Sequence, residues 1–292
     1  MKNARDYKDQ IDIGIITIRY DEFDAAFTGR FKIDATAIGS SGTRRYAISR
    51  VQAVNGTEYF VSLARSPDQG HGPAQSTAED MIEDLNPRWL IVIGIGGCIP
   101  SSEFCLGDVL VANVVPDFSL QAATHNNPPG FDLRGGEVHP EVEALVAHLP
   151  AMKTELKGWN SKRSIRMLYP PIEVPGNVSD ILYGPEEWRS KVINSLSKRF
   201  PEQGKVRQPI CWTGPIGTSN TLVKDVDLID QLLRGARGLV GIEMETGGVR
   251  RAARRKGRNI PVMTIRGVSD VIGLKRDSDW TTYACNSAAS FT

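Results

Sequence analysis

The sequence has few cysteines and no excess of charge of either sign. Its four cysteines are scattered over 292 residues without Cys-x-x-Cys spacing, which disfavours both a disulfide framework and a structural zinc site. The 35 Lys and Arg residues balance 34 Asp and Glu residues. Such a balance supplies no overall field for nucleic acid or for an anionic membrane, so a small-molecule partner is the better expectation.

Long hydrophobic runs are also missing. No window approaches the roughly 18 apolar residues that a membrane span requires. The N-terminal stretch MKNARDYKDQ is charged and lacks the apolar core of a secretory signal. We therefore expect a cytoplasmic protein. Aromatic residues make up only 7% of the chain, but hydrophobic residues make up 40%, which is enough for one large core.

Short apolar, β-branched runs alternate with helix-like segments along most of the chain. The runs span residues 11–18, 46–54, 59–63, 89–95, 109–115, 238–242 and 262–265, and the helix-like segments span residues 74–85, 226–233, 245–256 and 279–290. Alternation of this kind predicts an α/β fold in which helices cover the faces of a sheet.

The stretch from about residue 118 to residue 208 differs in composition. It is rich in Pro, Asn and Gly, as in HNNPPGFDLRGG and YPPIEVPGN, and its strand signal is weaker. Helix-like pieces occur near residues 141–148 and 186–199. Because loops on a rigid scaffold commonly shape binding sites, we expect one domain over residues 1–292 with an elaborated insertion here.

A glycine-rich turn, VIGIGGCIP, follows one of the strongest strand-like runs. Its glycines, Gly94, Gly96 and Gly97, would let backbone N–H groups approach a ligand. The turn is not a dinucleotide-binding fingerprint, because Ile99 stands where G-x-G-x-x-G requires its third glycine. By itself, the motif leaves a tight turn and a ligand site equally open.

Carboxylates occur where three other strand-like runs end. Glu22 follows the first run, Glu243 and Glu245 flank Met244 in GIEMETGG, and Asp270 ends the segment IRGVSD. Ligands of open α/β sheets bind beyond the carboxyl ends of strands, so these positions suit a site. Taken alone, Asp270 could equally cap a helix or a turn, and Glu22 fits the positive N-terminus of a helix better than a site. Glu243 and Glu245, taken alone, could be a paired acid and base.

Two further features favour a structural interpretation. Residues 249–258, VRRAARRKGR, fit a solvated helix face better than an anion site. They also lack the interleaved aromatics of a single-stranded nucleic-acid site. His71, in QGHGPAQ, could touch a substrate, but a lone histidine in a glycine turn is more often structural.

The order of these motifs resembles that of the nucleoside phosphorylase superfamily: a glutamate after the first strand, then GxGG, E-M-E and R-x-x-S-D. The similarity is closest to the hydrolytic branch, the methylthioadenosine/S-adenosylhomocysteine nucleosidases, and it covers residues 11–63, 71–115 and 212–292. The resemblance implies a single-domain, three-layer α/β/α fold with a mixed central sheet. It also implies no metal or organic cofactor and a homo-oligomer whose partner is a purine nucleoside or nucleotide.

The resemblance assigns the catalytic roles to two carboxylates. Glu22 matches the catalytic glutamate, which would activate water at the anomeric carbon. Asp270 matches the base-reading aspartate, supported by Ser269 and Arg266. As a leaving group, the purine needs a proton on N7, and Asp270 would supply it if a dry pocket keeps the carboxyl protonated.

The resemblance assigns the sugar to two other segments. Ile95, Gly96 and Gly97 match the turn beside the ribose. Met244 would pack under the sugar while Glu245 holds its 2′ and 3′ hydroxyls and so positions it between the catalytic groups. Glu243 has no substrate role in this pattern, so we expect Glu243→Ala to be mild and Glu245→Ala to abolish activity.

Water is the expected nucleophile. The phosphorylases of the superfamily hold phosphate with residues whose matching positions here are Val92 and Ile95, neither of which is a phosphate donor, and the glutamate of the hydrolases is present as Glu22. A phosphate-dependent purine nucleoside phosphorylase is the alternative of the same class. A catalytically silent nucleotide sensor is the alternative of another class, although such a sensor would not need both Glu22 and Asp270.

The group on the 5′ carbon stays open. Lys162, Arg163, Arg166 and Lys205 in the insertion could bind 5′-phosphates or form ordinary surface. The sequence is also similar to divergent bacterial family members attached to antiviral defence systems, some of which destroy adenine nucleotides such as ATP. An adenine nucleotide (AMP or ATP), an adenine nucleoside and a thio-nucleoside are all candidate substrates.

Overall fold

The strands of this chain form one mixed sheet. The computed structural model describes residues 2–53, 55–124, 127–168, 170, 178–200, 207–221 and 226–292. The strands within them are β1 (Lys2–Asn3), β2 (Ile13–Thr17), β3 (Ile33–Ile38), β4 (Arg45–Gln52), β5 (Glu58–Arg65), β6 (Trp89–Cys98), β7 (Val109–Thr124), β8 (Asn127–Glu137), β9 (Cys211–Thr218), β10 (Gly241–Glu243) and β11 (Val262–Val271).

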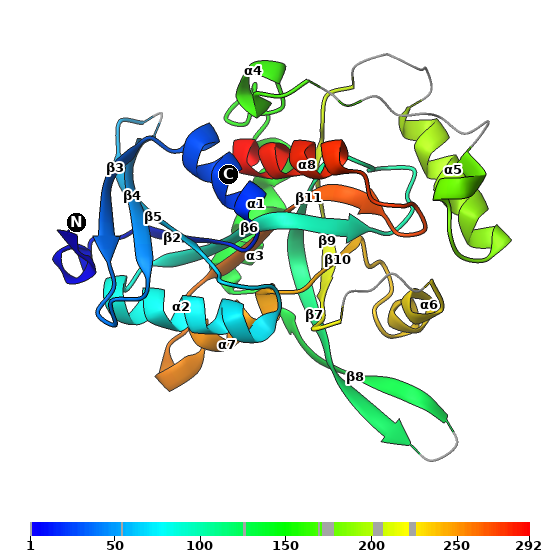
Figure 1. Ribbon diagram of the computed structural model, residues 1–292, viewed down its shortest axis with the longest axis horizontal. Coiled ribbons are helices and arrows are strands. Elements are labelled where there is room, and N and C mark those ends of the chain that lie inside the picture. The colour runs from blue at the N-terminus through cyan, green and yellow to red at the C-terminus, as the bar shows by residue number, and fades with distance from the viewer. Residues whose placement is uncertain are drawn as a thin grey trace.

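Helices lie on both sides of this sheet (Figure 1). They are α1 (Tyr20–Asp24), α2 (His71–Leu85), α3 (Pro140–His148), α4 (Lys162–Ile165), α5 (Glu186–Arg199), α6 (Val226–Gly235), α7 (Thr246–Ala253) and α8 (Ser278–Phe291). Short helical turns are η1 (Ala4–Tyr7), η2 (Ala25–Arg30), η3 (Leu149–Ala151), η4 (Val178–Ile181) and η5 (Arg255–Gly257).

The sheet closes on itself at one end. Its strand order is β1-β3-β4-β5-β2-β6-β10-β9-β7-β11, and β11 pairs again with β6, so the last five strands form a ring. Strand β6 is the junction: it runs parallel to β2 and β11, and Gly97 and Cys98 at its end pair with β10. The carboxyl ends of β2, β6 and β11 therefore meet at one edge, beside β10.

Consecutive residues of the central strands serve two separate cores. Ile15 and Ile93 pack in a cluster that contains the buried side of α8, whereas Ile16 and Val92 pack in a cluster formed with α2 and α7. This alternation follows from the two-residue period of a strand. Helices α2 and α7 contact each other on one face, and α1 and α8 contact each other on the opposite face (Figure 1). The predicted α/β fold with a mixed central sheet and flanking helices is confirmed.

The insertion is more sheet-like than the sequence indicates. The helices expected near residues 141–148 and 186–199 are present as α3 and α5. The expectation of weak strand structure is wrong, because β7 continues to Thr124 and pairs antiparallel with β8. This hairpin extends away from the body of the sheet (Figure 1). Backbone pairing between the two strands outweighs the Pro, Asn and Gly content from which a loop was expected.

Two other expectations concern the membrane and the cysteines. No helix of the described residues combines the length and apolar character needed to cross a bilayer. Cys98, Cys105 and Cys285 are buried, and Cys211 is partly buried. Burial raises the pKa of the Cys105 thiol to about 11, which suits a small core residue rather than a reactive thiol.

Candidate active site

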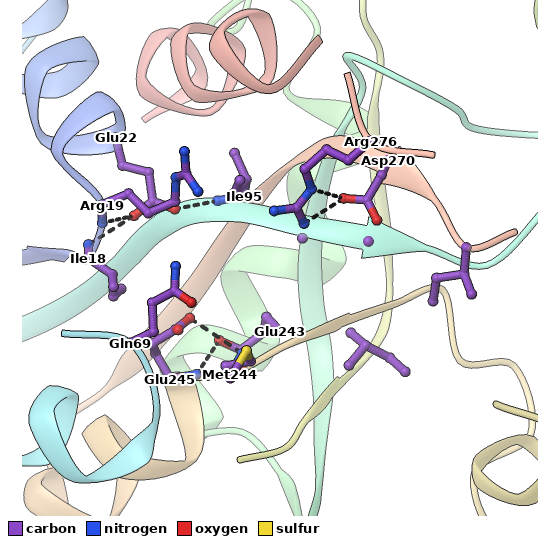
Figure 2. A pocket seen from close by; sticks show the side chains of 14 residues that line it. Ile18, Arg19, Glu22, Gln69, Ile95, Glu243, Met244, Glu245, Asp270 and Arg276 are labelled. Atoms are coloured by element: carbon purple, nitrogen blue, oxygen red, sulfur yellow. Dashed lines mark hydrogen bonds and ion pairs between the residues drawn. The ribbon is translucent and has the colours of Figure 1, made fainter. Parts of the chain in front are cut away.

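A cleft opens at the edge where the carboxyl ends of the parallel strands meet β10 (Figure 2). Its empty volume is about 640 Å³, counting the open space at its mouth. Seven of the nine site residues expected from the sequence line it: Glu22, Ile95, Gly96, Gly97, Met244, Glu245 and Asp270. Tertiary structure thus brings together residues that lie up to 248 positions apart in the chain.

Glu22 is held from three sides by backbone N–H groups. Its Oε2 accepts hydrogen bonds from the N–H groups of Ile18 and Arg19, both at 2.9 Å, and its Oε1 accepts one from Ile95 at 3.0 Å. Burial raises the pKa of this carboxyl, and it outweighs the opposing effects of Arg266 and the three N–H groups. A carboxylate with a raised pKa and a fixed position fits the role of a general base.

Glycines on β6 allow the approach of both proposed catalytic carboxylates. A Cβ atom at Gly94 would lie 2.6 Å from Oε1 of Glu22, and one at Gly97 would lie 3.1 Å from Oδ2 of Asp270. Three residues of strand separate these glycines, roughly 10 Å. Glu22 and Asp270 therefore lie along β6 at a separation on the scale of a nucleoside. The glycine-rich turn is explained by this close packing on the strand itself.

Glu243 and Glu245 form the wall opposite β6. Oε2 of Glu243 accepts hydrogen bonds from the N–H groups of Glu245 and Thr246, at 3.1 and 3.0 Å, and from the Thr246 hydroxyl at 2.9 Å. Met244 and Glu245 line the cleft beside it. Glu243 thus builds the turn that presents Glu245, which explains why two glutamates lie so close together in GIEMETGG.

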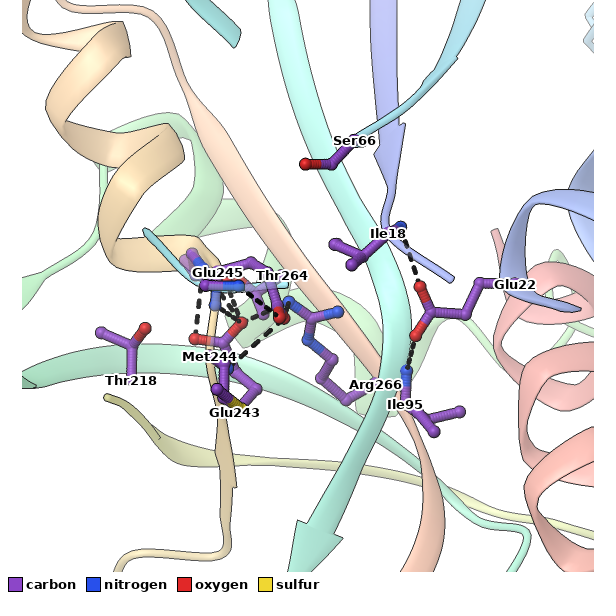
Figure 3. A network of polar contacts seen from close by, with 12 residues as sticks. Ile18, Glu22, Ser66, Ile95, Thr218, Glu243, Met244, Glu245, Thr264 and Arg266 are labelled. Carbon is purple, nitrogen blue, oxygen red and sulfur yellow. Dashed lines mark hydrogen bonds and ion pairs between the residues drawn. The ribbon is translucent and has the colours of Figure 1, made fainter. Parts of the chain in front are cut away.

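Arg266 lies in the centre of this carboxylate group (Figure 3). Its Nη2 forms an ion pair with Glu243 and lies 3.3 Å from Oε2 of Glu245. The expectation that Arg266 supports Asp270 is wrong. Strand β11 places Arg266 opposite Gly94 and Asp270 opposite Gly97, so the two side chains serve different ends of the cleft.

The two glutamates respond oppositely to this arrangement. Burial raises the pKa of Glu245 to about 7, helped by the charges of Glu243 and Glu22, and Arg266 only partly offsets the effect. Burial also favours the neutral form of Glu243, but Arg266, Thr218 and the backbone N–H groups together lower its pKa. At neutral pH, Glu243 is therefore the permanent anion of the pair, and Glu245 titrates.

Arg266 keeps donors free on its other side. Its Nε and Nη1 are buried and have no hydrogen-bond partner within the described ranges. A Cβ at Gly94 would meet both Nη1 of Arg266 and Oε1 of Glu22, so these two groups converge on the same backbone position. A water or a sugar oxygen beside Glu22 would find a buried donor there.

Asp270 is bound through one of its two oxygens. Oδ1 accepts hydrogen bonds from the Ser269 hydroxyl at 2.6 Å and from Nε and Nη2 of Arg276 at 2.9 and 2.7 Å. Ser269 thus lies where the sequence placed it, as a support of Asp270 behind the cleft lining. The sequence did not predict Arg276 as a neighbour of Asp270. Oδ2 is the oxygen left to face a base.

Four polar residues of the cleft were not among the predicted site residues: Arg19, Gln69, Arg276 and Glu243, to which the family pattern gave no substrate role. Arg19 precedes Glu22 by one helical turn, so the motif itself contained that signal. Gln69 and Arg276 lie in loops, and neither spacing nor periodicity marks them. Only the fold brings such residues to a site.

The basic residues suspected of binding 5′-phosphates do not reach the cleft where they can be placed. Lys162, Arg163 and Arg166 are absent from its lining, and Nη1 of Arg166 donates to the Thr28 carbonyl at 2.7 Å. Lys205 lies outside the described residues.

The two features given a structural interpretation agree with it. In the basic segment, Arg255 and Lys256 form ion pairs with Glu79 and Glu83 of α2 at 2.6 and 2.8 Å. His71 is buried and lies between the hydroxyls of Thr218 and Ser119, at 2.7 and 2.8 Å. Neither lines the cleft. Within the part of the chain that the structure describes, no group of three or more His, Cys, Asp or Glu side chains is arranged to hold a metal.

The chain belongs to the phosphorylase superfamily, whose family model matches residues 21–290. It is 23% identical over 226 residues to a death domain-containing ATP nucleosidase of Amphimedon queenslandica. That match covers 76% of this chain but only 36% of the relative, so the chain spans about a third of the relative's length.

Solved nucleosidases share the fold at low sequence identity. The 5′-methylthioadenosine/S-adenosylhomocysteine nucleosidase of Neisseria meningitidis, in complex with methylthio-immucillin-A, is 13% identical with a TM-score of 0.63, and 96% of each chain is covered. The futalosine hydrolase of Helicobacter pylori is 14% identical with a TM-score of 0.60, covering 97% of this chain and 95% of that one. The resemblance read from the motifs is confirmed.

Proposed function

We propose that this chain hydrolyses the N-glycosidic bond of an adenine nucleoside or nucleotide, releasing free base and ribose or ribose phosphate. The observation that carries the proposal is the arrangement of Glu22 and Asp270 along β6, with Glu245 on the opposite wall. A base at Asp270 and a ribose at Glu245 place the bond between the two catalytic carboxylates. The nucleosidase names among relatives support this class, and the ATP nucleosidase supports an adenine nucleotide as one candidate.

The reaction balances with groups of this chain alone. Water loses a proton to Glu22 as its oxygen bonds the anomeric carbon, and Nη1 of Arg266 helps to hold that oxygen. The C–N bond breaks as the purine N7 takes a proton from Oδ2 of Asp270. Glu245, when ionised, accepts hydrogen bonds from the ribose 2′ and 3′ hydroxyls, and Met244 packs against the sugar. Fixing both partners in this way removes much of the entropic barrier.

Base release without phosphate is the deciding test. The protein is incubated in phosphate-free buffer with adenosine, methylthioadenosine, AMP, ADP, ATP, inosine and guanosine, and free base is measured. Release without phosphate supports hydrolysis. Release that needs added phosphate would indicate the phosphorylase alternative instead.

The sensor alternative needs a variant. Asp270→Asn keeps the size of the side chain and its bond to Ser269 but has no acidic proton to give. We expect it to bind adenine ligands while base release falls about 10²- to 10⁴-fold. Base release at the wild-type rate would rule out Asp270 as the acid.

A homo-oligomer and a cytoplasmic location remain predictions. Light scattering of the purified protein tests the homo-oligomer.

A further inference from the structure

The 5′ group of the substrate is the least determined part of the proposed function. Resting on that function, we infer that Arg19 binds the 5′-phosphate next to the ribose, so that 5′-phosphorylated purine nucleotides are preferred over nucleosides. The cleft, its charges and the present partner of Arg19 carry this inference.

Arg19 lies at the ribose end of the cleft. Its backbone N–H donates to Oε2 of Glu22 at 2.9 Å, and its side chain lines the cleft. Figure 2 shows Arg19 and Gln69 at the end that contains Glu22 and Glu245, and Asp270 with Arg276 at the other end. Because the 5′ carbon belongs to the ribose, a 5′ substituent extends from this end, beside Arg19 rather than Arg276.

The charge of the ribose end makes an additional cation necessary for a phosphate. Arg266 lies among Glu22, Glu243 and Glu245: its Nη2 is bound to Glu243 and Glu245, and its Nη1 lies towards Glu22 at Gly94. A phosphate brought beside these carboxylates would be repelled unless another positive group compensates. Arg276 is bound to Asp270 at the far end. Among the cleft-lining residues that are described, Arg19 is the remaining cation.

Arg19 is held by a bond that a phosphate can replace. Its Nε and Nη2 contact Asp21 at 2.9 and 2.7 Å, with side chains 35% and 28% exposed. Partly exposed pairs of this kind contribute little to stability, so exchanging the partner costs little. A phosphate offers the same paired oxygens with more charge, and guanidinium binds it in the same two-pronged geometry. Asp21 thus keeps Arg19 at the cleft until a nucleotide arrives.

The test compares AMP with adenosine through the ratio of their kcat/KM values. In Arg19→Met, which keeps an unbranched side chain without the charge, we expect this ratio to fall on the order of 10- to 100-fold. In Asp21→Asn the competing charge is removed while an oxygen remains for the Glu22 N–H, so the ratio should rise. Arg50→Met is the matched control: Arg50 forms a similar exposed pair with Asp34, 3.6 Å apart, away from the cleft, and the ratio should stay unchanged.

Several outcomes would overturn the inference. One is an unchanged AMP-to-adenosine ratio of kcat/KM in Arg19→Met. Another is that Arg19→Met loses only the base release that added phosphate stimulates. That result would mean that Arg19 binds the phosphate that attacks the sugar, and not a 5′-phosphate of the substrate. Calorimetric binding of AMP and adenosine separates the two proposals. If no compound releases base, the proposed hydrolysis fails. In that case, tighter binding of AMP than of adenosine that is lost in Arg19→Met still supports this inference. Equal binding of AMP and adenosine overturns it.

Discussion

Glu243 and Glu245 differ by two positions and have opposite roles. Both are buried, both contact Arg266 and both line the cleft, but Glu243 also accepts the backbone and hydroxyl donors of the turn. Arg266 and these donors together lower the pKa of Glu243, whereas burial raises the pKa of Glu245 to about 7. Glu243 therefore builds the turn, and Glu245 is the glutamate proposed to bind the ribose.

Glu243→Ala should be strongly destabilising, contrary to the mild effect expected from the family pattern. The change leaves the buried Arg266 short of its main counter-charge and three donors of the turn without an acceptor. Removing one partner of a buried ion pair typically costs about 3–5 kcal/mol. Urea unfolding should show this loss, with exposed Glu143→Ala on α3 as the control. An unfolding free energy equal to that of the control would refute the role given to Glu243.

Substrate binding should weaken as the pH falls through about 7. The reason is that protonated Glu245 loses charge as an acceptor for the ribose hydroxyls. We expect KM for adenosine to rise below this pH, and kcat to fall as Glu22, whose pKa is also raised, takes up its proton. Because 2′-deoxyadenosine offers Glu245 one hydroxyl fewer, its KM should depend less on pH. Equal dependence for both substrates would contradict this assignment of Glu245.

At the scale of elements, β6 organises the site. Its glycines let Glu22 and Arg266 approach at Gly94 and let Asp270 approach at Gly97. Its pairing with β10 fixes the position of the segment that contains the two glutamates of the other wall. A strand without side chains at these positions acts as the floor of the cleft. The amino-acid sequence of β6 is thus determined by the close packing of these side chains as much as by hydrophobic periodicity.

Gly94→Ala should lower kcat at least tenfold while the protein stays folded. The added methyl group would lie 2.6 Å from Oε1 of Glu22 and must displace it or Arg266. A shift of about 1 Å at a catalytic group can cost around 100-fold in rate. The control is Gly72→Ala in α2, where a Cβ meets nothing within 4 Å. Full activity in Gly94→Ala, with the fold intact by circular dichroism, would show that Glu22 tolerates displacement.

At the scale of the whole molecule, the site lowers stability at neutral and alkaline pH. Burial raises the pKa of Glu245 from an ordinary value of 4.5 to about 7, and it raises that of Glu22 as well. Between these values the folded state retains protons that the unfolded chain has released. The free energy of unfolding therefore falls as the pH rises through this window. Glu243, with its lowered pKa, acts in the opposite sense, and its contribution is lost only at lower pH.

Glu245→Gln should therefore stabilise the protein at pH 8 while removing activity. The amide keeps the shape of the side chain and has no charge to bury, so we expect a gain of about 1–3 kcal/mol in unfolding free energy. The gain should shrink toward pH 5, where wild-type Glu245 is already protonated. Denaturant titrations at both pH values measure it. A gain of the same size at both values would mean that the Glu245 charge is not its cause.

The sequence by itself determined the class of fold and the positions of the main carboxylates. Apolar periodicity is local, so the runs around Ile15 and Ile93 and the helices α2 and α8 could be predicted from nearby residues. Glu22, Met244, Glu245 and Asp270 could be predicted because each lies at or just beyond the end of a strand and their order matches a family.

The tertiary structure alone decided which of these groups meet. Four features depend on strand register and on contacts between distant segments. They are the ring closure through β11 and β6, the β7–β8 hairpin, the pairing of Arg266 with the glutamates and not with Asp270, and the positions of Arg19 and Arg276 in the cleft. Strand register assigns each side chain a neighbour and a face, and a window of sequence contains neither. For that reason the positions of most cleft residues could be predicted from the sequence, whereas their electrostatics could be found only from the folded chain.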